Sequence, residues 1–304
     1  MRILITGVTG FLGRHIARHL VALGHEVTGI ARHAPLEPLP GGVRFVSGSI
    51  EEARLISPLL AASDWLLHLA WNGTPGSSQG QPATEASANI LPTARLLEAA
   101  QFHRDCAVMF VSTGGALHAG NGAAATESGP IRARSYYGAA KASVELMLQA
   151  MADQTGHRAV VLRPSNVYGP GQPAKAGFGV IPALMRCALE GLAFEVLGDG
   201  STARDFLYVA DFCEVVGKSL SLGARSGGVD VLNAGSGTLV SINALCDHVA
   251  RLSGMPIERR FREARTVDPP QVVLDSRRAH ALLDWQPRVS IEEGLRLKIG
   301  RAHV

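Results

Sequence analysis

The sequence predicts an α/β fold in which a doubly wound parallel sheet carries helices on both faces and a smaller region follows. Two observations support this prediction. Short apolar, β-rich runs alternate with helical patterns over the first half of the chain, as in repeated strand–helix units. A glycine-rich turn also separates the first strand from the first helix. The length of 304 residues and the apolar content of 46% suffice for one large domain with a smaller appendage.

The predicted elements follow in chain order. Arg2–Thr6 is the first strand, and the helical pattern of His15–Leu23 comes after it. Five further β-rich runs are expected to be parallel strands: Glu26–Ala31, Val43–Val46, Trp65–Leu69, Ala107–Ser112 and Ala159–Arg163. The regular alternation ends near Asn166. We therefore expect one domain over residues 1–165 and a second region over 166–304, interleaved because a strand near 229–233 returns to the sheet.

The glycine-rich turn indicates a phosphate-binding site. Gly7, Gly10 and Gly13 are spaced as Gly-x-x-Gly-x-x-Gly, and Phe11 and Leu12 complete the turn. A strand, a glycine turn and a helix in this order let backbone N–H groups at the helix N-terminus approach a pyrophosphate. The turn therefore predicts a dinucleotide site of the Rossmann type.

Tyr137 and Lys141 indicate the type of reaction for which the dinucleotide is used. Residues four apart lie on one face of a helix, so the Lys141 ammonium can favour the phenolate of Tyr137. A tyrosine in this setting can donate and accept a proton near neutral pH. Alone, this spacing often means no more than a solvated helix face. With the glycine turn in the same half of the chain, it indicates redox chemistry.

Composition narrows the class of protein. The net charge is only +3 and no basic stripe or aromatic platform points to nucleic acid. No apolar run has membrane-spanning length and no signal peptide is recognised, so we expect a soluble, cytoplasmic protein. The cysteines lack metal-ligand spacing, which predicts reduced thiols and no metal site. They are Cys106, Cys187, Cys213 and Cys246.

Motifs along nearly the whole chain resemble the extended branch of the short-chain dehydrogenase/reductase superfamily. They are His68-Leu69-Ala70, Asn89, Leu162–Pro170, Gly198–Gly200, Arg204–Asp211, Asn233–Gly235, Leu283–Pro287 and Glu292–Leu295. Within that branch the chain is similar to the NAD(P)-dependent nucleotide-sugar epimerases, dehydratases and reductases. This resemblance implies a nucleotide-diphosphate sugar as substrate. It also implies a homodimer, formed through the helices expected near 85–100 and 137–152.

The resemblance also assigns site residues. Those expected to bind the cofactor are Gly7, Gly10, Phe11, Leu12, Gly13, Arg32, Ser49, Ile50, Leu69, Ala70, Asn89, Tyr137, Lys141 and Pro164. Those expected to bind the substrate are Thr113, Asn166, Arg204 and Arg265. The two arginines suit the diphosphate, because planar guanidinium groups match phosphate oxygens. The catalytic set is Tyr137 and Lys141 with a strand-end hydroxyl. Thr113 is favoured for that hydroxyl, and Ser112 is the alternative.

Three departures from the family pattern bear on the reaction. NAD-using members carry an acidic residue after the second strand, whereas this chain has Ala31 and Arg32, which favours NADP(H) while NAD(H) stays possible. Ser49 stands where an aspartate is common. Gly114 and Gly115 follow Thr113 where dehydratases have an Asp-Glu pair, which argues against sugar dehydration.

These observations predict hydride transfer at a sugar C4. A 4-ketoreductase acting on a nucleotide 4-keto-6-deoxy sugar is favoured, because an NADPH preference suits net reduction. A C4 epimerase is the alternative, since it uses the same residues in both directions. A dinucleotide-binding sensor without catalysis and a reductase of a non-sugar ketone are more distant alternatives. Retention of Tyr137, Lys141 and the hydroxyl argues against the sensor.

Overall fold

The computed structural model describes residues 1–118, 124–174, 179–224, 227–264 and 269–300. The chain forms two compact units, each discontinuous in sequence. The first unit comprises Met1–Thr113, Ser135–Arg163 and Cys213–Leu232, and the second comprises Gly114–Arg134, Pro164–Phe212 and Asn233–Val304.

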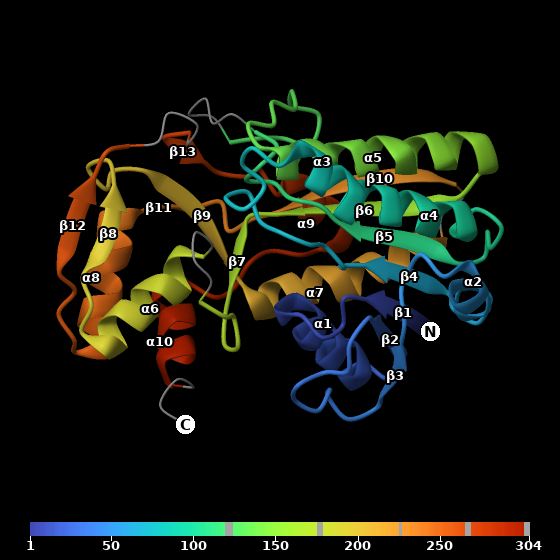
Figure 1. Cartoon of the computed structure of the whole chain (residues 1–304), viewed down its shortest axis with the longest axis horizontal. Coiled ribbons are helices and arrows are strands. Elements are labelled where there is room, and N and C mark those ends of the chain that lie inside the picture. The colour runs from blue at the N-terminus through green and yellow to red at the C-terminus, as the bar shows by residue number, and fades with distance from the viewer. Residues whose placement is uncertain (119–123, 175–178, 225–226, 265–268, 301–304) are drawn as a thin grey trace. The chain divides into compact units, whose positions relative to one another are not determined.

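A seven-stranded sheet forms the centre of the first unit (Figure 1). Its strands are β1 (Arg2–Thr6), β2 (Glu26–Ala31), β3 (Val43–Ser47), β4 (Trp65–His68), β5 (Ala107–Val111), β6 (Arg158–Pro164) and β10 (Gly228–Ala234). Their order is β10-β6-β5-β4-β1-β2-β3, and the neighbours from β3 to β6 run parallel. The chain order reverses between β1 and β4, where doubly wound sheets bind their ligands. The predicted fold class is confirmed, with strand ends shifted by one residue.

Helices cover both faces of this sheet. They are α1 (Phe11–Ala22), α2 (Ala53–Ala61), α3 (Pro82–Glu85), α4 (Leu91–Ala100), α5 (Tyr136–Thr155) and α7 (Val209–Ser219), with a π-helical turn η1 (Ala86–Ile90) and a 3₁₀ turn η2 (Leu220–Ala224). Helices α4 and α5 lie on one face and α1 and α7 on the other (Figure 1). The successive crossovers through α4 and α5 therefore stay on one face, whereas those through α1 and α7 use the other.

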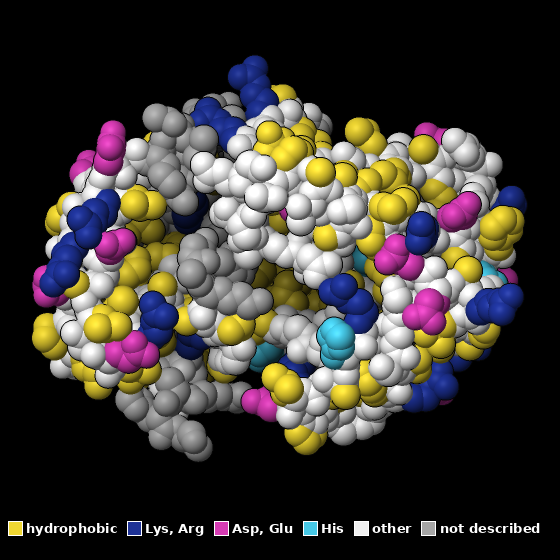
Figure 2. All heavy atoms as spheres, in the orientation of Figure 1, with side chains coloured by type: hydrophobic (Ala, Val, Ile, Leu, Met, Phe, Trp, Pro, Cys, Tyr) yellow, Lys and Arg dark blue, Asp and Glu magenta, His cyan; other side chains and the backbone are white. Residues whose placement is uncertain are grey.

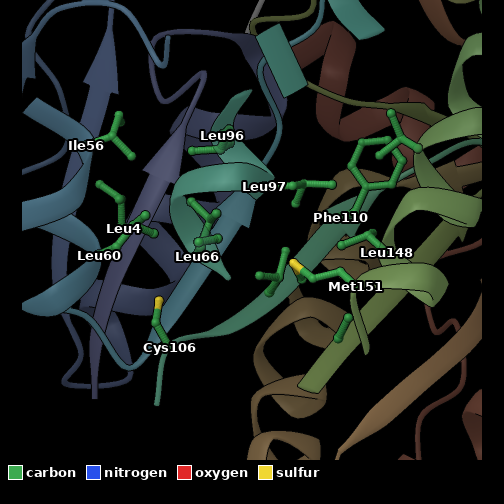
Figure 3. Packing of buried hydrophobic residues seen from close by; sticks show 14 of the residues in the cluster. Leu4, Ile56, Leu60, Leu66, Leu96, Leu97, Cys106, Phe110, Leu148 and Met151 are labelled. Atoms are coloured by element: carbon green, nitrogen blue, oxygen red, sulfur yellow. The ribbon is translucent and has the colours of Figure 1, made fainter. Parts of the chain in front are cut away.

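Apolar side chains from the sheet and from α2, α4 and α5 form the core of the first unit (Figure 3). Leu66 on β4 and Phe110 on β5 meet Leu60, Leu96 and Leu148 from the three helices, and all five are fully buried. Burying such a side chain stabilises the fold by roughly 1.5–3 kcal/mol. This packing holds the carboxyl ends of β4 and β5 beside the N-terminal half of α5.

The second unit combines short strands with helices. Its elements are β7 (Asn166–Tyr168), β8 (Phe194–Leu197), β9 (Ala203–Tyr208), β11 (Leu239–Ser241), β12 (Arg259–Arg262), β13 (Gln271–Val272), α6 (Val180–Glu190), α8 (Ile242–Ser253), α9 (Arg277–Leu283) and α10 (Ile291–Gly300). Strand β9 pairs with β7, β11 and β13, while β8 and β12 form a separate pair. Buried Asp205 on β9 accepts hydrogen bonds from the backbone N–H groups of Ser236, Gly237 and Leu274, so it ties two separate segments to the strand.

Acidic and basic side chains are interspersed on the face of the molecule shown in Figure 2. On β12, for example, Arg260 pairs with Glu258 and Arg262 pairs with Glu195. All the cysteines are buried and unpaired. Within the described residues, no helix combines the length and apolar character that a membrane crossing requires.

Candidate functional site

The glycine turn between β1 and α1 leaves no room for side chains. Gly7 has φ +72°, and a Cβ on it would lie 2.8 Å from the backbone nitrogen of Ala70. A Cβ on Gly13 would lie 2.3 Å from the carbonyl oxygen of Gly7 and 2.7 Å from Cα of Val8. Gly10 precedes α1 and supplies no side-chain cap, so the first N–H groups of the helix face outward without one. The turn therefore fits a pyrophosphate.

A buried chain of neutral hydrogen bonds fixes the loop after β4. Oγ1 of Thr6 lies 2.8 Å from Nδ1 of His68, and Nε2 of His68 lies 3.0 Å from Oγ1 of Thr93. Oγ1 of Thr6 also accepts the backbone N–H groups of Leu69 and Ala70, both at 3.2 Å. Burial, with a smaller effect of the nearby lysine charge, lowers the pKa of His68 to about 3, so the ring stays neutral. The predicted cofactor residues Leu69 and Ala70 are thus held beside Gly7.

Asn89 holds the next part of the same loop. Its Oδ1 accepts the N–H of Asn72 at 2.7 Å, and its Nδ2 donates to the carbonyl of Asn72 and to Oε1 of Glu85, both at 2.8 Å. Pro92 lacks an N–H for the carbonyl of Ala88, and Nδ2 of Asn72 donates to that carbonyl at 3.1 Å instead. The amide of Asn89 is therefore engaged with protein groups, and Asn89 shapes the loop predicted to bind the cofactor.

The predicted pair Tyr137 and Lys141 lies on the first turns of α5. Nζ of Lys141 is 5.9 Å from the ring centroid of Tyr137 and donates to the carbonyl of Val111 at 2.8 Å. Burial lowers the pKa of Lys141 to about 7, against the opposing charges of Glu85 and Glu145. Burial and the charge of Glu85 raise the pKa of Tyr137. The structure thus brings the two groups together at the end of β5. The pKa of Tyr137 is raised, however, and not lowered towards neutral as the spacing predicted, because burial is the dominant influence on it.

The two candidate hydroxyls differ in their surroundings. Ser112 is buried, and its Oγ donates to Oε1 of Glu145. That carboxylate also accepts two hydrogen bonds at 3.1 Å from Nε of Arg163. Ser112 therefore belongs to a buried ion-pair network behind the site, whereas Thr113 is only half-buried. This geometry favours Thr113 as the hydroxyl that meets a substrate.

The residues predicted to meet the adenosine end follow β2 and β3. Nη2 of exposed Arg32 donates to Oδ1 of Asn72 at 3.0 Å. Ser49 begins the connection to α2, where its N–H donates to Glu52 and its Oγ accepts the N–H of Glu51. Ile50 packs against the core. Arg32 is thus tied to the same loop that Asn89 holds.

The predicted substrate residues belong to the second unit, apart from Thr113. Asn166 on β7 is exposed and donates from Nδ2 to the carbonyl of Asp205 at 2.9 Å. Arg204 lies on the adjacent strand β9 and donates from Nη1 to the carbonyl of Ala203 at 2.9 Å. Pro164, predicted to contact the cofactor, is buried and accepts the N–H of Gly114 at its carbonyl. Arg265 lies outside the described residues.

Sequence reasoning missed three residues around the Tyr137–Lys141 pair: Trp71, Glu85 and Glu145. Two of them had a signal in the sequence, because Glu145 follows Lys141 by four residues on the same helix and Glu85 precedes Asn89 by four. Trp71 had none. Its ring lies 3.8 Å from Nζ of Lys141, a contact that only the folded chain creates.

Comparisons with known proteins identify the family of the chain. The sequence matches the NAD dependent epimerase/dehydratase family over residues 3–235. It is 31% identical to a UDP-glucose 4-epimerase of Mycolicibacterium smegmatis, over 97% of this chain and 96% of that protein. It is 30% identical to a dTDP-glucose 4,6-dehydratase of Streptomyces niveus, over 97% of this chain and 90% of that protein.

Solved structures show the same relationship. The UDP-glucose 4-epimerase of Thermotoga maritima, determined with UDP-glucose, superposes with a TM-score of 0.92 at 29% identity, covering 100% of this chain and 99% of that one. The Thermus thermophilus UDP-glucose 4-epimerase, in complex with NAD, gives 0.90 at 29% identity with the same coverage. The chain belongs to the NAD-dependent epimerase/dehydratase family. It is an enzyme of the extended short-chain dehydrogenase/reductase type, as the motifs predicted.

Proposed function

We propose that the protein is a nucleotide-sugar 4-epimerase that uses NAD. The observation that carries this proposal is the pair of half-buried Tyr137 and buried Lys141 in the same unit as the glycine turn. UDP-glucose 4-epimerases among its sequence relatives and structural neighbours support the epimerase, since they match over nearly the whole chain. The sequence alone favoured a 4-ketoreductase, but the comparisons support the alternative.

The residues of this chain have distinct roles in that reaction. A bound nicotinamide dinucleotide supplies the hydride acceptor and donor. Tyr137 takes the proton of the sugar C4 hydroxyl as that carbon is oxidised, and returns it when the ketone is reduced on its other face. Thr113 hydrogen-bonds the reacting oxygen, and Lys141 stabilises the phenolate by its charge. Gly7, Gly10 and Gly13 let the turn bind the pyrophosphate.

The choice of NAD departs from the expectation drawn from Arg32. That expectation depended on a guanidinium available for a 2′-phosphate, yet one of its donors binds Oδ1 of Asn72. The family is described as NAD-dependent, and the Thermus thermophilus relative is a complex with NAD. The argument for net reduction followed from an NADPH preference, so it weakens together with that preference.

A sugar 4,6-dehydratase is disfavoured by the residues after Thr113. Gly114 and Gly115 provide no acid or base for the elimination of water. A Cβ on Gly114 would lie 2.3 Å from the side chain of Leu274, so a larger residue needs that leucine to move. The similarity to a dTDP-glucose 4,6-dehydratase at 30% identity therefore does not extend to an acid or base at these two positions.

The substrate is proposed to be a nucleoside-diphosphate hexose. Residues 1–165 mainly bind the dinucleotide, and residues 166–304 mainly bind the nucleotide sugar. Arg204 and Arg265 are proposed to pair with the diphosphate, and Asn166 to add a polar contact. Arg204 and Asn166 lie on neighbouring strands, which supports a shared role.

A homodimer through α4 and α5 also belongs to this proposal. The two helices pack side by side, and they expose apolar side chains, Leu91 at 47% and Leu146 at 71%. Such side chains are suited to burial against a second copy. Light scattering should give a molecular mass twice that of the chain. Leu146→Glu should reduce the measured mass to that of a single chain.

Activity tests the reaction directly. The protein is incubated with UDP-glucose or UDP-galactose and NAD, and the sugars are followed by proton NMR together with the absorbance of reduced nicotinamide. Interconversion of the two hexoses without net change in that absorbance is expected. Stoichiometric loss of NADPH on a 4-keto-6-deoxy nucleotide sugar would instead identify a reductase. Accumulation of a 4-keto-6-deoxy product from the hexose would identify a dehydratase.

A further inference from the structure

Glu85 is a buried carboxylate that the proposed reaction does not yet use. It ends α3 and is only 5% exposed. Its Oε1 accepts the indole N–H of Trp71 at 3.0 Å and Nδ2 of Asn89 at 2.8 Å. A charge in such a place is costly unless an opposite charge compensates it.

Trp71 connects this carboxylate to the lysine of the site. Its N–H edge points at Glu85, and its ring face lies 3.8 Å from Nζ of Lys141. The same ring packs edge-on against Tyr137, with centroids 6.1 Å apart. A carboxylate that accepts the indole N–H makes the ring face more electron-rich, which strengthens its attraction for an ammonium. The indole therefore contacts all three polar groups.

The charges around Lys141 show why Glu85 matters more than its neighbour Glu145. Glu145 lies on α5 itself, and its carboxylate forms a buried ion pair with Arg163 on β6. On β4, His68 is neutral, because burial lowers its pKa to about 3. Glu85 on α3 forms no such pair within the described residues, so its charge is available to balance the ammonium.

We propose that Glu85 is a positioning residue for the Tyr137–Lys141 pair: held by Trp71, its carboxylate keeps the lysine charged and its ammonium against the indole face. This inference adds a residue to the proposed reaction and rests on the roles given there to Tyr137 and Lys141. Its physical part, the coupling of Glu85 to Lys141, stands whether or not the substrate is a nucleotide sugar.

The lysine can be observed without any activity. The chain has four lysines, Lys141, Lys175, Lys218 and Lys298, so a protein labelled with ¹³Cε-lysine gives a simple NMR spectrum. A Lys141→Arg variant assigns the signal. In the full chain Lys141 should titrate near 7, the pKa to which burial lowers it. In Glu85→Gln the midpoint should fall by about one pH unit, because an opposing charge close by is gone.

Glu85→Gln tests charge and not packing, because its amide oxygen can still accept from Trp71 and Asn89. Lys298 is the internal control, since it lies in the second unit and its titration, lowered by burial to about 8, should not move. If Glu85→Gln does not fold, Trp71→Phe serves instead. It keeps an aromatic ring, although a smaller one, and deletes the N–H that binds Glu85, so it should lower the Lys141 midpoint by less than Glu85→Gln does. An unchanged Lys141 midpoint in the folded variant would overturn the proposal.

Turnover gives a second readout. Removing a negative charge lowers the pKa values of Tyr137 and Lys141 alike, so the whole pH profile of kcat should move to lower pH by about one unit in Glu85→Gln. A structural role alone would lower kcat without moving the profile, and that result would contradict the proposal. If neither the parent nor the variant turns over any nucleotide sugar, the proposed function fails, while the lysine titration still decides the role of Glu85.

Discussion

Two polar regions lie at the carboxyl ends of β4 and β5, and they differ in the charge of their side chains. Around Thr6, His68 and Thr93 every group is neutral, and the Thr6 hydroxyl accepts backbone N–H groups of the loop after β4. Around Tyr137 and Lys141 the groups are ionisable, and burial shifts their pKa values. The neutral region can fix a shape at any moderate pH. The ionisable region stores the capacity to move a proton, and its behaviour must depend on pH.

The largest effect is expected from a substitution of Tyr137, at the centre of the ionisable region. Tyr137→Phe deletes one hydroxyl and almost no packing volume, so turnover should fall by about 10²- to 10⁴-fold while NAD affinity stays nearly unchanged. Steady-state kinetics and calorimetry measure the two quantities. A variant that kept more than about a tenth of the parent kcat would remove Tyr137 from the proton path.

The neutral region should make the stability of the protein fall in acid. The pKa of His68 is about 3 in the folded protein, against about 6.5 in an unfolded chain. Below pH 6.5 the unfolded chain therefore binds a proton that the folded protein does not. The contribution of His68 to stability is complete above that pH and is lost as the pH falls towards 3.

Replacing the imidazole should flatten this dependence. The unfolding free energy of both proteins should fall between pH 7 and pH 4. In His68→Asn this fall should be smaller than in the parent by roughly 3 kcal/mol. Urea unfolding at each pH measures the slopes, and exposed His33→Asn is the matched control. Equal slopes for the parent and His68→Asn would mean that the ring is protonated in the fold.

The two hydroxyls at the end of β5 sharpen the contrast. Thr113→Val should lower kcat by about 10²-fold, because a group that stabilises the reacting oxygen is lost. Ser112→Ala should leave kcat within a few-fold and lower the unfolding free energy by about 1 kcal/mol, because it removes a hydrogen bond to Glu145. The reverse pattern in kinetics and thermal unfolding would assign the reaction to Ser112.

The smallest expected effect concerns the glycine turn, which lies beside the neutral region at Ala70. A methyl group on Gly13 meets backbone atoms at 2.3 Å, which should cost about 1–3 kcal/mol of stability. The helix propensity gained by alanine returns only about 1 kcal/mol of this. Gly10→Ala is the matched control, since its Cβ lies 3.3 Å from the nearest atom. If both variants unfold at the same temperature and bind NAD equally, close packing does not explain Gly13.

Much of the fold and part of the site could be read from local pattern. Strand boundaries in the central sheet were predicted to within one residue, because central strands such as β4 and β5 are buried on both faces and form apolar runs. The first α-helix began four residues before its predicted start, at Phe11, since the glycine turn masks its first residues. The pairing of Tyr137 with Lys141 followed from their spacing on one helix.

By itself, then, the sequence determined the strand–helix alternation, the phosphate-binding turn and the proton-transfer pair, because each depends on residues close together in the chain. Only the tertiary structure decided that Ser112 is bound by Glu145, 33 residues away, and that Arg32 reaches Asn72, 40 residues away. The same holds for the contact of Trp71 with Lys141. The physical reason is that parallel strands bring their carboxyl ends together from distant parts of the chain, and side-chain partners there are set by packing that no local pattern encodes.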